Sequence, residues 1–164
     1  MKGTGGRIIG ARFSVFLPVH QGPVPAPAKE LAEQPSSEWS GGGRVLLVED
    51  EDMVRAVAER ALTRAGYEVM TCSDGEEGLA AITRGEQFDL VVSDVVMPGM
   101  DGPTMARGIR QIEPDLPMLF MSGYAEEHLR NEIDIPNMHF LAKPFSVQEI
   151  SDKVAGVMRA LVQQ

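Results

Sequence analysis

Short apolar runs alternate with segments of helical periodicity from residue 44 to the end of the chain. A short apolar run favours a buried strand, whereas apolar residues three and four positions apart favour one face of a helix. The runs predict five strands, at residues 45–48, 67–71, 88–93, 117–121 and 138–142. The periodic segments predict five helices, at residues 54–65, 73–84, 101–113, 125–131 and 146–161.

Polar residues and a glycine indicate where several of these helices begin and end. Asp101 is a candidate N-cap of the third helix, and Gly66 ends the first. Two capping boxes are predicted, Ser73 with Glu76 and Ser146 with Glu149. The helix faces predicted to point into the core include Val54, Val57, Ala61, Met105, Ile109 and Ile112.

The predicted strands are apolar on both faces, and each is followed by a helix. This pattern indicates an α/β fold with a parallel sheet covered on two sides and right-handed crossovers. In such sheets the binding crevice lies beyond the carboxyl ends of the strands. The residues that directly follow each strand are therefore the candidates for chemistry.

Composition changes sharply near Arg44. The first 43 residues contain 5 of the 11 prolines and 8 of the 17 glycines, and their formal charge is +1, against −10 for residues 44–164. Residues 12–19 alternate like a single strand, and residues 21–43 have the composition of a proline- and glycine-rich linker. We expect a domain boundary near Arg44, with one globular domain at residues 44–164.

The acidic composition excludes some classes of partner. A formal net charge of −9 argues against nucleic acid or an anionic membrane as the main partner. Cys72 is the single cysteine, so no internal disulfide forms, and a reducing, cytoplasmic location is expected. No window approaches the roughly 20 apolar residues of a membrane-spanning helix. Secretion is the minor alternative, because residues 2–28 only loosely resemble a signal peptide.

Polar residues of complementary chemistry follow four of the five strands. They are Glu49 and Asp50 after the first strand, Asp94 after the third, Ser122 after the fourth and Lys143 after the fifth. Three carboxylates in one crevice repel one another, which is tolerable only with raised pKa values or a bound cation. All-oxygen ligands with open positions favour Mg²⁺. A carboxylate beside a cation, with a hydroxyl and an ammonium opposite, suits phosphoryl transfer.

Each of these residues also has a structural interpretation. An acidic run is usually a solvated loop or helix start, and an Asp, a Ser or a Lys beside a turn is mostly structural when it stands alone. Their joint occurrence at four strand ends favours the chemical interpretation.

Four segments resemble the receiver domain of two-component phosphorelays. They are VLLVEDED, VVSDVVMPGMDG, LFMSGYA and FLAKPF, and the likeness extends from residue 44 to about residue 161. The resemblance implies a flavodoxin-like sheet of strand order 2-1-3-4-5 flanked by five helices. Residues 44–164 are accordingly identified as a receiver domain.

The resemblance also implies a role for each residue of the motifs. Asp94 is the expected phospho-acceptor, with Lys143 and Ser122 assisting. The expected Mg²⁺ ligands are Glu49, Asp50, Asp94 and the backbone carbonyl of Val96. Ser122 and Phe140 are the expected switch residues. The chain departs from the family pattern in having Glu49 where an aspartate is usual and Ser122 where a threonine is commoner.

Details such as VEDEDMVR and FMSGYAEEHLR are most similar to the C-terminal receiver of CckA-like hybrid histidine kinases. The segment GGRIIGARFSVFLPV resembles the last strand of a histidine-kinase ATP-binding domain. The resemblance implies a remnant of that domain at residues 1–20, a linker at residues 21–43 and the receiver after them.

The expected function is to accept a phosphoryl group from a phosphohistidine, with Mg²⁺ as cofactor and only self-directed catalysis, so the chain is not expected to be an enzyme. The expected partner is a histidine kinase or a histidine phosphotransfer protein, bound at the first helix and the final strand-to-helix region. One alternative is a free-standing response regulator. A haloacid-dehalogenase-like phosphohydrolase is the alternative of another class, but it needs an aspartate where this chain has Val96.

Overall fold

The computed structural model describes residues 42–123 and 135–162. The strands in these ranges are β1 (Arg44–Val48), β2 (Glu68–Cys72), β3 (Leu90–Asp94), β4 (Met118–Ser122) and β5 (Met138–Ala142). The helices are α1 (Asp52–Arg64), α2 (Gly75–Thr83), α3 (Gly102–Ile112) and α5 (Val147–Val162). The described residues thus contain four of the five expected helices. The helix expected at 125–131, the remnant at 1–20 and almost all of the linker at 21–43 lie outside them.

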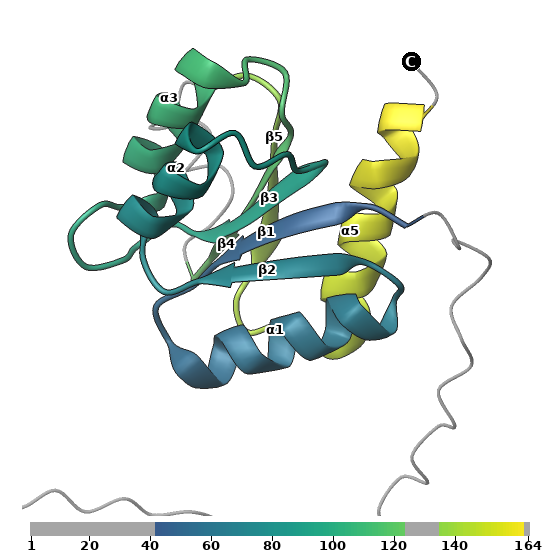
Figure 1. Cartoon of the computed structure of the whole chain (residues 1–164). Helices are drawn as coiled ribbons and strands as arrows, with labels where there is room; N and C mark the ends of the chain where they lie inside the picture. Colours follow the sequence, from purple (N-terminus) through teal and green to yellow (C-terminus); the bar gives the residue numbers. More distant parts are fainter. Residues whose placement is uncertain (1–41, 124–134, 163–164) are drawn as a thin grey trace, which may run out of the picture. The chain divides into compact units, whose positions relative to one another are not determined.

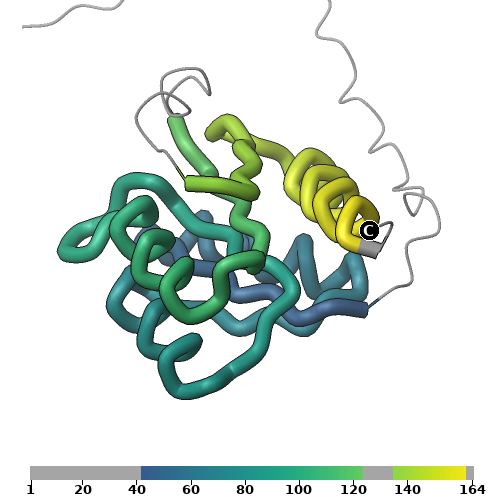
Figure 2. The backbone as a smooth tube through the Cα atoms, turned by 90° about the horizontal axis from the view of Figure 1, so that it is seen from above, coloured from purple at the N-terminus to yellow at the C-terminus, as the bar shows by residue number. Residues whose placement is uncertain are grey.

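The five strands form one parallel sheet in the order β2-β1-β3-β4-β5, which confirms the expected order (Figure 1). Helices α2 and α3 cover one face of the sheet, and α1 and α5 cover the other (Figures 1 and 2). Successive side chains of a strand point to opposite faces. Leu46 and Val48 therefore join the core under α2 and α3, whereas Val45 and Leu47 join the core under α1 and α5.

The apolar faces predicted for α1 and α3 are too wide. Ala61, Met105 and Ile109 are buried as expected, but Val57 and Ile112 are each 43% exposed. Successive side chains of a helix are rotated by about 100° around the helix axis. Only a narrow stripe of a helix that lies on a sheet therefore reaches the core. Val57 and Ile112 lie outside that stripe.

The start of α2 differs by one residue from the predicted capping box of Ser73 and Glu76. Asp74 is the N-cap, and its carboxylate accepts a hydrogen bond from the Glu77 N–H at 2.8 Å. Glu77 in turn accepts a bond from the Ser73 N–H at 3.0 Å. The ionised Asp74 forms a stronger, charge-assisted cap than the Ser73 hydroxyl could provide.

The other predicted helix ends are confirmed. Asp101 caps α3 by accepting a bond from the Thr104 N–H at 2.8 Å. Ser146 and Glu149 form the predicted capping box, with reciprocal bonds of 2.7 and 3.2 Å. Gly66 follows α1 with a φ of 94°, a left-handed conformation that glycine adopts without strain. None of the helices in the described ranges combines the length and apolar character needed to cross a membrane.

Candidate functional site

The carboxyl ends of β1, β3, β4 and β5 bring the predicted polar residues to one edge of the sheet. Glu49 and Asp50 directly follow β1, Asp94 and Ser122 are the last residues of β3 and β4, and Lys143 directly follows β5. Asp94 pairs with Met121 of β4, and Ser122 is the next residue after Met121. The Ser122 carbonyl accepts a hydrogen bond from the Lys143 N–H at 2.7 Å. Parallel pairing therefore assembles the site from segments that are distant in the sequence.

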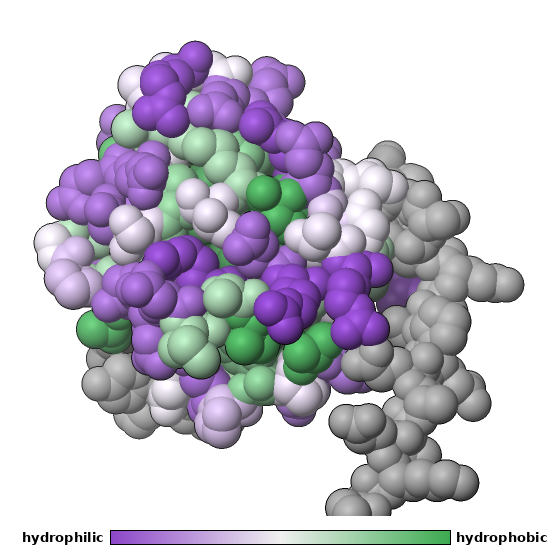
Figure 3. All heavy atoms as spheres, turned by 60° about the horizontal axis from the view of Figure 1, so that its bottom comes forward, coloured by the Kyte–Doolittle hydropathy of each residue, from purple (hydrophilic) through white to green (hydrophobic). Residues whose placement is uncertain are grey.

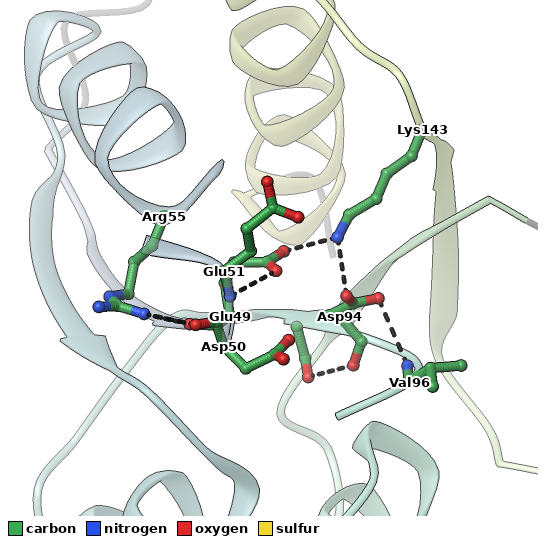
Figure 4. A network of polar contacts seen from close by, with 8 residues as sticks. Glu49, Asp50, Glu51, Arg55, Asp94, Val96 and Lys143 are labelled. Carbon is green, nitrogen blue, oxygen red and sulfur yellow. Dashed lines mark hydrogen bonds and ion pairs between the residues drawn. The ribbon is translucent and has the colours of Figure 1, made fainter. Parts of the chain in front are cut away.

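The Lys143 ammonium lies between two carboxylates (Figure 4). Its Nζ is 2.7 Å from Glu49 Oε2 and 2.7 Å from Asp94 Oδ2. The side chain of Glu49 is completely buried, whereas that of Asp94 is 14% exposed and that of Lys143 is 22% exposed. Lys143 thus compensates the buried charge of Glu49 while it contacts the expected acceptor.

Burial and pairing shift the pKa values of this pair. Burial raises the pKa of Glu49 above its ordinary value, the negative charge of Asp94 adds to the rise, and the bond from Lys143 opposes it. Burial lowers the pKa of Lys143, but its hydrogen bonds to Asp94 and Glu49 outweigh burial and raise the pKa overall. Lys143 is therefore a permanent cation at neutral pH.

Glu49, Asp50 and Asp94 can each offer a carboxylate oxygen, and the three oxygens lie within 4.8 Å of one another. A cluster of this size, with Asp50 exposed and Asp94 partly exposed, fits a divalent cation that keeps some of its water. The structure thus brings together three of the residues expected to hold Mg²⁺, and their role as ligands stays a prediction. The Val96 N–H donates to Asp94 Oδ1 at 3.4 Å, and the role of the Val96 carbonyl stays a prediction.

The glycine at the start of α3 permits a close approach to the backbone of Asp94. A methyl group at Gly102 would lie 2.2 Å from the Asp94 carbonyl oxygen, which is far inside van der Waals contact. The Gly102 N–H also donates to the Val95 carbonyl at 3.0 Å. Gly102 therefore fixes the course of the loop that follows Asp94.

The two expected switch residues, Ser122 and Phe140, are both buried. Ser122 is 3% exposed and Phe140 is 5% exposed. The Phe140 ring stacks on Phe120, with ring centroids 6.0 Å apart. Phe140 is thus a part of the core beneath the site, and its role as a switch stays a prediction.

Arg55 contacts the backbone of the acidic pair, although no pattern in the sequence predicted a role for it. Its Nη1 donates to the Glu49 carbonyl at 2.6 Å and lies 3.4 Å from the Asp50 carbonyl oxygen (Figure 4). The available signal was a basic residue in the first turn of a helix, five positions after Asp50. That signal does not distinguish such a contact from an ordinary surface arginine.

An apolar groove of about 470 Å³ lies beside the site, between the first turns of α1 and the segment after β5. It is lined by Met53, Val54, Val57, Lys143, Pro144 and Phe145. Met53 is 74% exposed, the largest exposure among the large apolar side chains of the described residues. Figure 3 shows hydrophobic residues gathered among hydrophilic ones on the face that is turned forward in that view. This groove and the carboxylate cluster share Lys143 as a common border.

Comparison with known proteins gives consistent results. A profile of the response regulator receiver domain matches residues 45–155. Sensor kinase CckA of Brucella abortus (strain 2308) is 41% identical over 168 residues, covering 94% of this chain but only 18% of the kinase. The response regulator receiver protein CpdR of the same strain is 34% identical over 118 residues, covering 71% of this chain and 98% of CpdR.

Solved structures agree with these matches. The crystal structure of the receiver domain from hybrid histidine kinase CckA is 39% identical, with a TM-score of 0.61, and the match covers 71% of this chain and 99% of that domain. The chemotaxis response regulator CheY4 of Vibrio cholerae is 29% identical, with a TM-score of 0.63, covering 70% of this chain and 97% of CheY4. From its profile match, its sheet order and its relatives, the chain belongs to the response regulator receiver domain family of two-component signalling.

Proposed function

We propose that Asp94 accepts a phosphoryl group from a phosphohistidine of a partner protein. The observation that supports this most directly is the position of the Asp94 carboxylate, which belongs to the three-carboxylate cluster and lies 2.7 Å from Lys143 Nζ. In the transfer, an oxygen of Asp94 forms a bond to phosphorus while the bond from phosphorus to the histidine nitrogen breaks. The electron pair of that bond returns to the imidazole of the partner.

The neighbouring residues of the proposed acceptor would balance the charge of the phosphoryl group. Glu49, Asp50 and Asp94 hold Mg²⁺ in this proposal, with the Val96 carbonyl as a further ligand. Bound Mg²⁺ supplies positive charge to the phosphoryl oxygens. Lys143 places its ammonium on one of these oxygens, and Ser122 donates a hydrogen bond to another.

The proposed chemistry modifies only the protein itself, through acceptance, return and hydrolysis of the phosphoryl group. A phosphohydrolase of the haloacid-dehalogenase type needs a second aspartate two positions after the nucleophile. Val96 occupies that position, and its side chain has no ionisable group that could act as an acid or a base. The self-directed reaction is therefore preferred over turnover of a small substrate.

After phosphorylation, Ser122 and Phe140 form the proposed switch. Ser122 is the last residue of β4, and Phe140 lies in β5, paired with Phe120. A shift of the Ser122 hydroxyl toward a phosphoryl oxygen would open space next to β5. The ring of Phe140 can respond to such a change because it packs directly on Phe120.

We further propose that the chain is the C-terminal part of a hybrid histidine kinase. The match with sensor kinase CckA covers 94% of the chain, whereas the receiver profile matches only residues 45–155. Similarity to the kinase thus continues outside the receiver. This supports a kinase remnant at residues 1–20 and a linker at residues 21–43. The match with CpdR, which covers 71% of the chain, supports the alternative of a free-standing response regulator.

The proposed partner is a histidine kinase or a histidine phosphotransfer protein that docks in the groove beside Lys143. The groove is apolar where Met53, Val54 and Phe145 line it, and it borders the acceptor site through Lys143. A helix that presents a histidine beside an apolar face fits such a surface. The apolar face can be buried in the groove while the histidine side chain reaches Asp94.

Phosphorylation by acetyl phosphate tests the proposed acceptor. Asp94→Asn is expected to abolish the gain in mass that one phosphoryl group gives in intact-protein mass spectrometry with Mg²⁺ present. Asp115→Asn, which removes an exposed carboxylate in the α3–β4 loop, is the matched control and is expected to label like the parent protein. Labelling of Asp94→Asn at undiminished stoichiometry would overturn the assignment.

A further inference from the structure

Arg55 extends from the first turn of α1 back over the loop that contains the acidic pair. Its Nη1 donates to the Glu49 carbonyl at 2.6 Å and lies 3.4 Å from the Asp50 carbonyl oxygen. Its Nη2 pairs with the carboxylate of Asp52. The Arg55 side chain is only 20% exposed, although it is on the surface side of the loop. One guanidinium thus contacts three of the four residues from Glu49 to Asp52, all except Glu51.

The stability of α1 does not explain this position. A cation in the first turn of a helix is unfavourable, because the N-terminus of the helix already has a partial positive charge. The ion pair with Asp52 compensates little, since the Asp52 side chain is 89% exposed and exposed pairs contribute little. The contacts with the two carbonyls are therefore the more informative feature of Arg55.

These contacts complete the fixation of the Glu49 backbone. The Glu49 N–H donates to the Cys72 carbonyl at 3.2 Å, which attaches it to β2. The Glu49 carbonyl accepts from Arg55, so both backbone polar groups of Glu49 are hydrogen-bonded. The backbone sets the direction of each Cα–Cβ bond, so the same contacts restrict where the carboxylates of Glu49 and Asp50 can lie.

We propose that Arg55 is a positioning residue for the cation site, an inference that rests on the proposed binding of Mg²⁺. The guanidinium holds the peptides of Glu49 and Asp50 so that their carboxylates meet that of Asp94 before the cation arrives. A guanidinium suits this task because its planar, forked donors reach several acceptors at once, whereas a lysine ammonium is a single point of contact.

Charge and positioning predict opposite effects of removing Arg55. The guanidinium is a positive charge close to the acidic loop, so electrostatics alone predicts that its loss strengthens cation binding. Loss of positioning predicts weaker binding, because the loop must then be ordered when the cation binds. Supporting groups that orient metal ligands commonly change metal affinity by about tenfold or more. We expect the positioning effect to exceed the charge effect.

Titration of the full chain with MgCl₂, followed by backbone amide NMR shifts, tests this inference. Arg55→Gln is expected to weaken the apparent Mg²⁺ affinity about tenfold. Arg55→Lys keeps the charge but cannot bridge the same acceptors, and it is expected to weaken the affinity by a similar factor. Arg60→Gln removes the same charge from an exposed position of α1 and is expected to leave the affinity within about twofold of the parent protein.

Each result leads to a distinct conclusion. Absence of any response in the parent protein would overturn the Mg²⁺ site, and this inference with it. Mg²⁺ binding by the parent protein with equal or stronger binding by both Arg55 variants would overturn the inference alone. Thermal unfolding in EDTA establishes that each variant is folded at the titration temperature. If Arg55→Gln is unfolded there, the comparison of Arg55→Lys with the parent protein decides.

Discussion

Lys143 Nζ lies 2.7 Å from the carboxylate of Glu49, a residue 94 positions earlier in the sequence. The Glu49 side chain is completely buried. Among the hydrogen bonds of the described residues, its carboxylate is stabilised by this ammonium and by the backbone N–H of Glu51, 3.2 Å away. The same ammonium contacts Asp94. The first acidic residue is thus paired with the lysine that also contacts the proposed acceptor.

Replacing Lys143 by methionine would leave the buried Glu49 carboxylate without its cation. We expect the protein in EDTA at pH 7 to lose about 3 kcal/mol of unfolding free energy, the lower end for broken buried pairs, because Lys143 is partly exposed. Denaturant titration measures this loss. The double variant Glu49→Gln, Lys143→Met removes both charges and is expected to recover most of it. Equal stability of Lys143→Met and the parent protein would contradict the inferred pairing.

Gly102→Ala is expected to destabilise the protein by about 2 kcal/mol, because its methyl group would meet the Asp94 carbonyl oxygen and force the loop to move. The Cβ would lie only 2.2 Å from that oxygen. Gly156→Ala in α5 is the matched control, since a methyl group there meets no atom within 4 Å. The control is expected to gain about 0.5–1 kcal/mol from the better helix propensity of alanine. Thermal unfolding of both variants tests the pair, and a neutral Gly102→Ala would refute the expected clash.

The apolar groove predicts a separation between two phosphodonors. Met53→Ala and Val57→Ala are expected to slow transfer from the phosphohistidine of a partner about tenfold each, because each truncation removes apolar surface that a docked partner would bury. Labelling by acetyl phosphate, which needs no docking surface, is expected to stay unchanged. Ile112→Ala in α3 is the control, since Ile112 has the same 43% exposure as Val57. Equal losses with both donors would count against a docking role for the groove.

The capping box of α5 predicts a dependence of stability on acidic pH. Hydrogen bonds from the backbone and the side chain of Ser146 lower the pKa of Glu149 below 4.5. Because the pKa is lower in the folded state, the contribution of Glu149 is complete above pH 4.5 and disappears as the pH falls through the folded pKa.

Measurement of unfolding free energy against pH tests this dependence. The difference between the parent protein and Glu149→Gln is expected to be constant near neutral pH and to shrink in the acidic range. Glu59→Gln removes an exposed carboxylate from α1 and controls for the loss of one negative charge. A difference that grows as the pH falls would have the wrong sign for this cap.

The order of the elements and the set of residues at the strand ends follow from local patterns in the sequence. Apolar runs and helical periodicity are local properties, so they located all five strands and the helices of the described ranges to within a few residues. Parallel pairing then requires the carboxyl ends to share an edge, which is why Glu49, Asp50, Asp94, Ser122 and Lys143 could be grouped without coordinates. Local caps at Asp101 and Ser146 were equally predictable, because both partners of each bond lie within one turn of a helix.

Which of these residues touch and which are buried depends on how the elements pack against one another. The complete burial of Glu49, its bond to Lys143 and the approach of Gly102 to Asp94 all depend on how segments far apart in the sequence pack against each other. The exposure of Val57 and Ile112 and the contact of Arg55 with the acidic loop depend on how each helix is rotated on its neighbours. A periodic pattern gives the direction of a helix face only to within about one residue, so the packed sheet and helices had to fix these contacts.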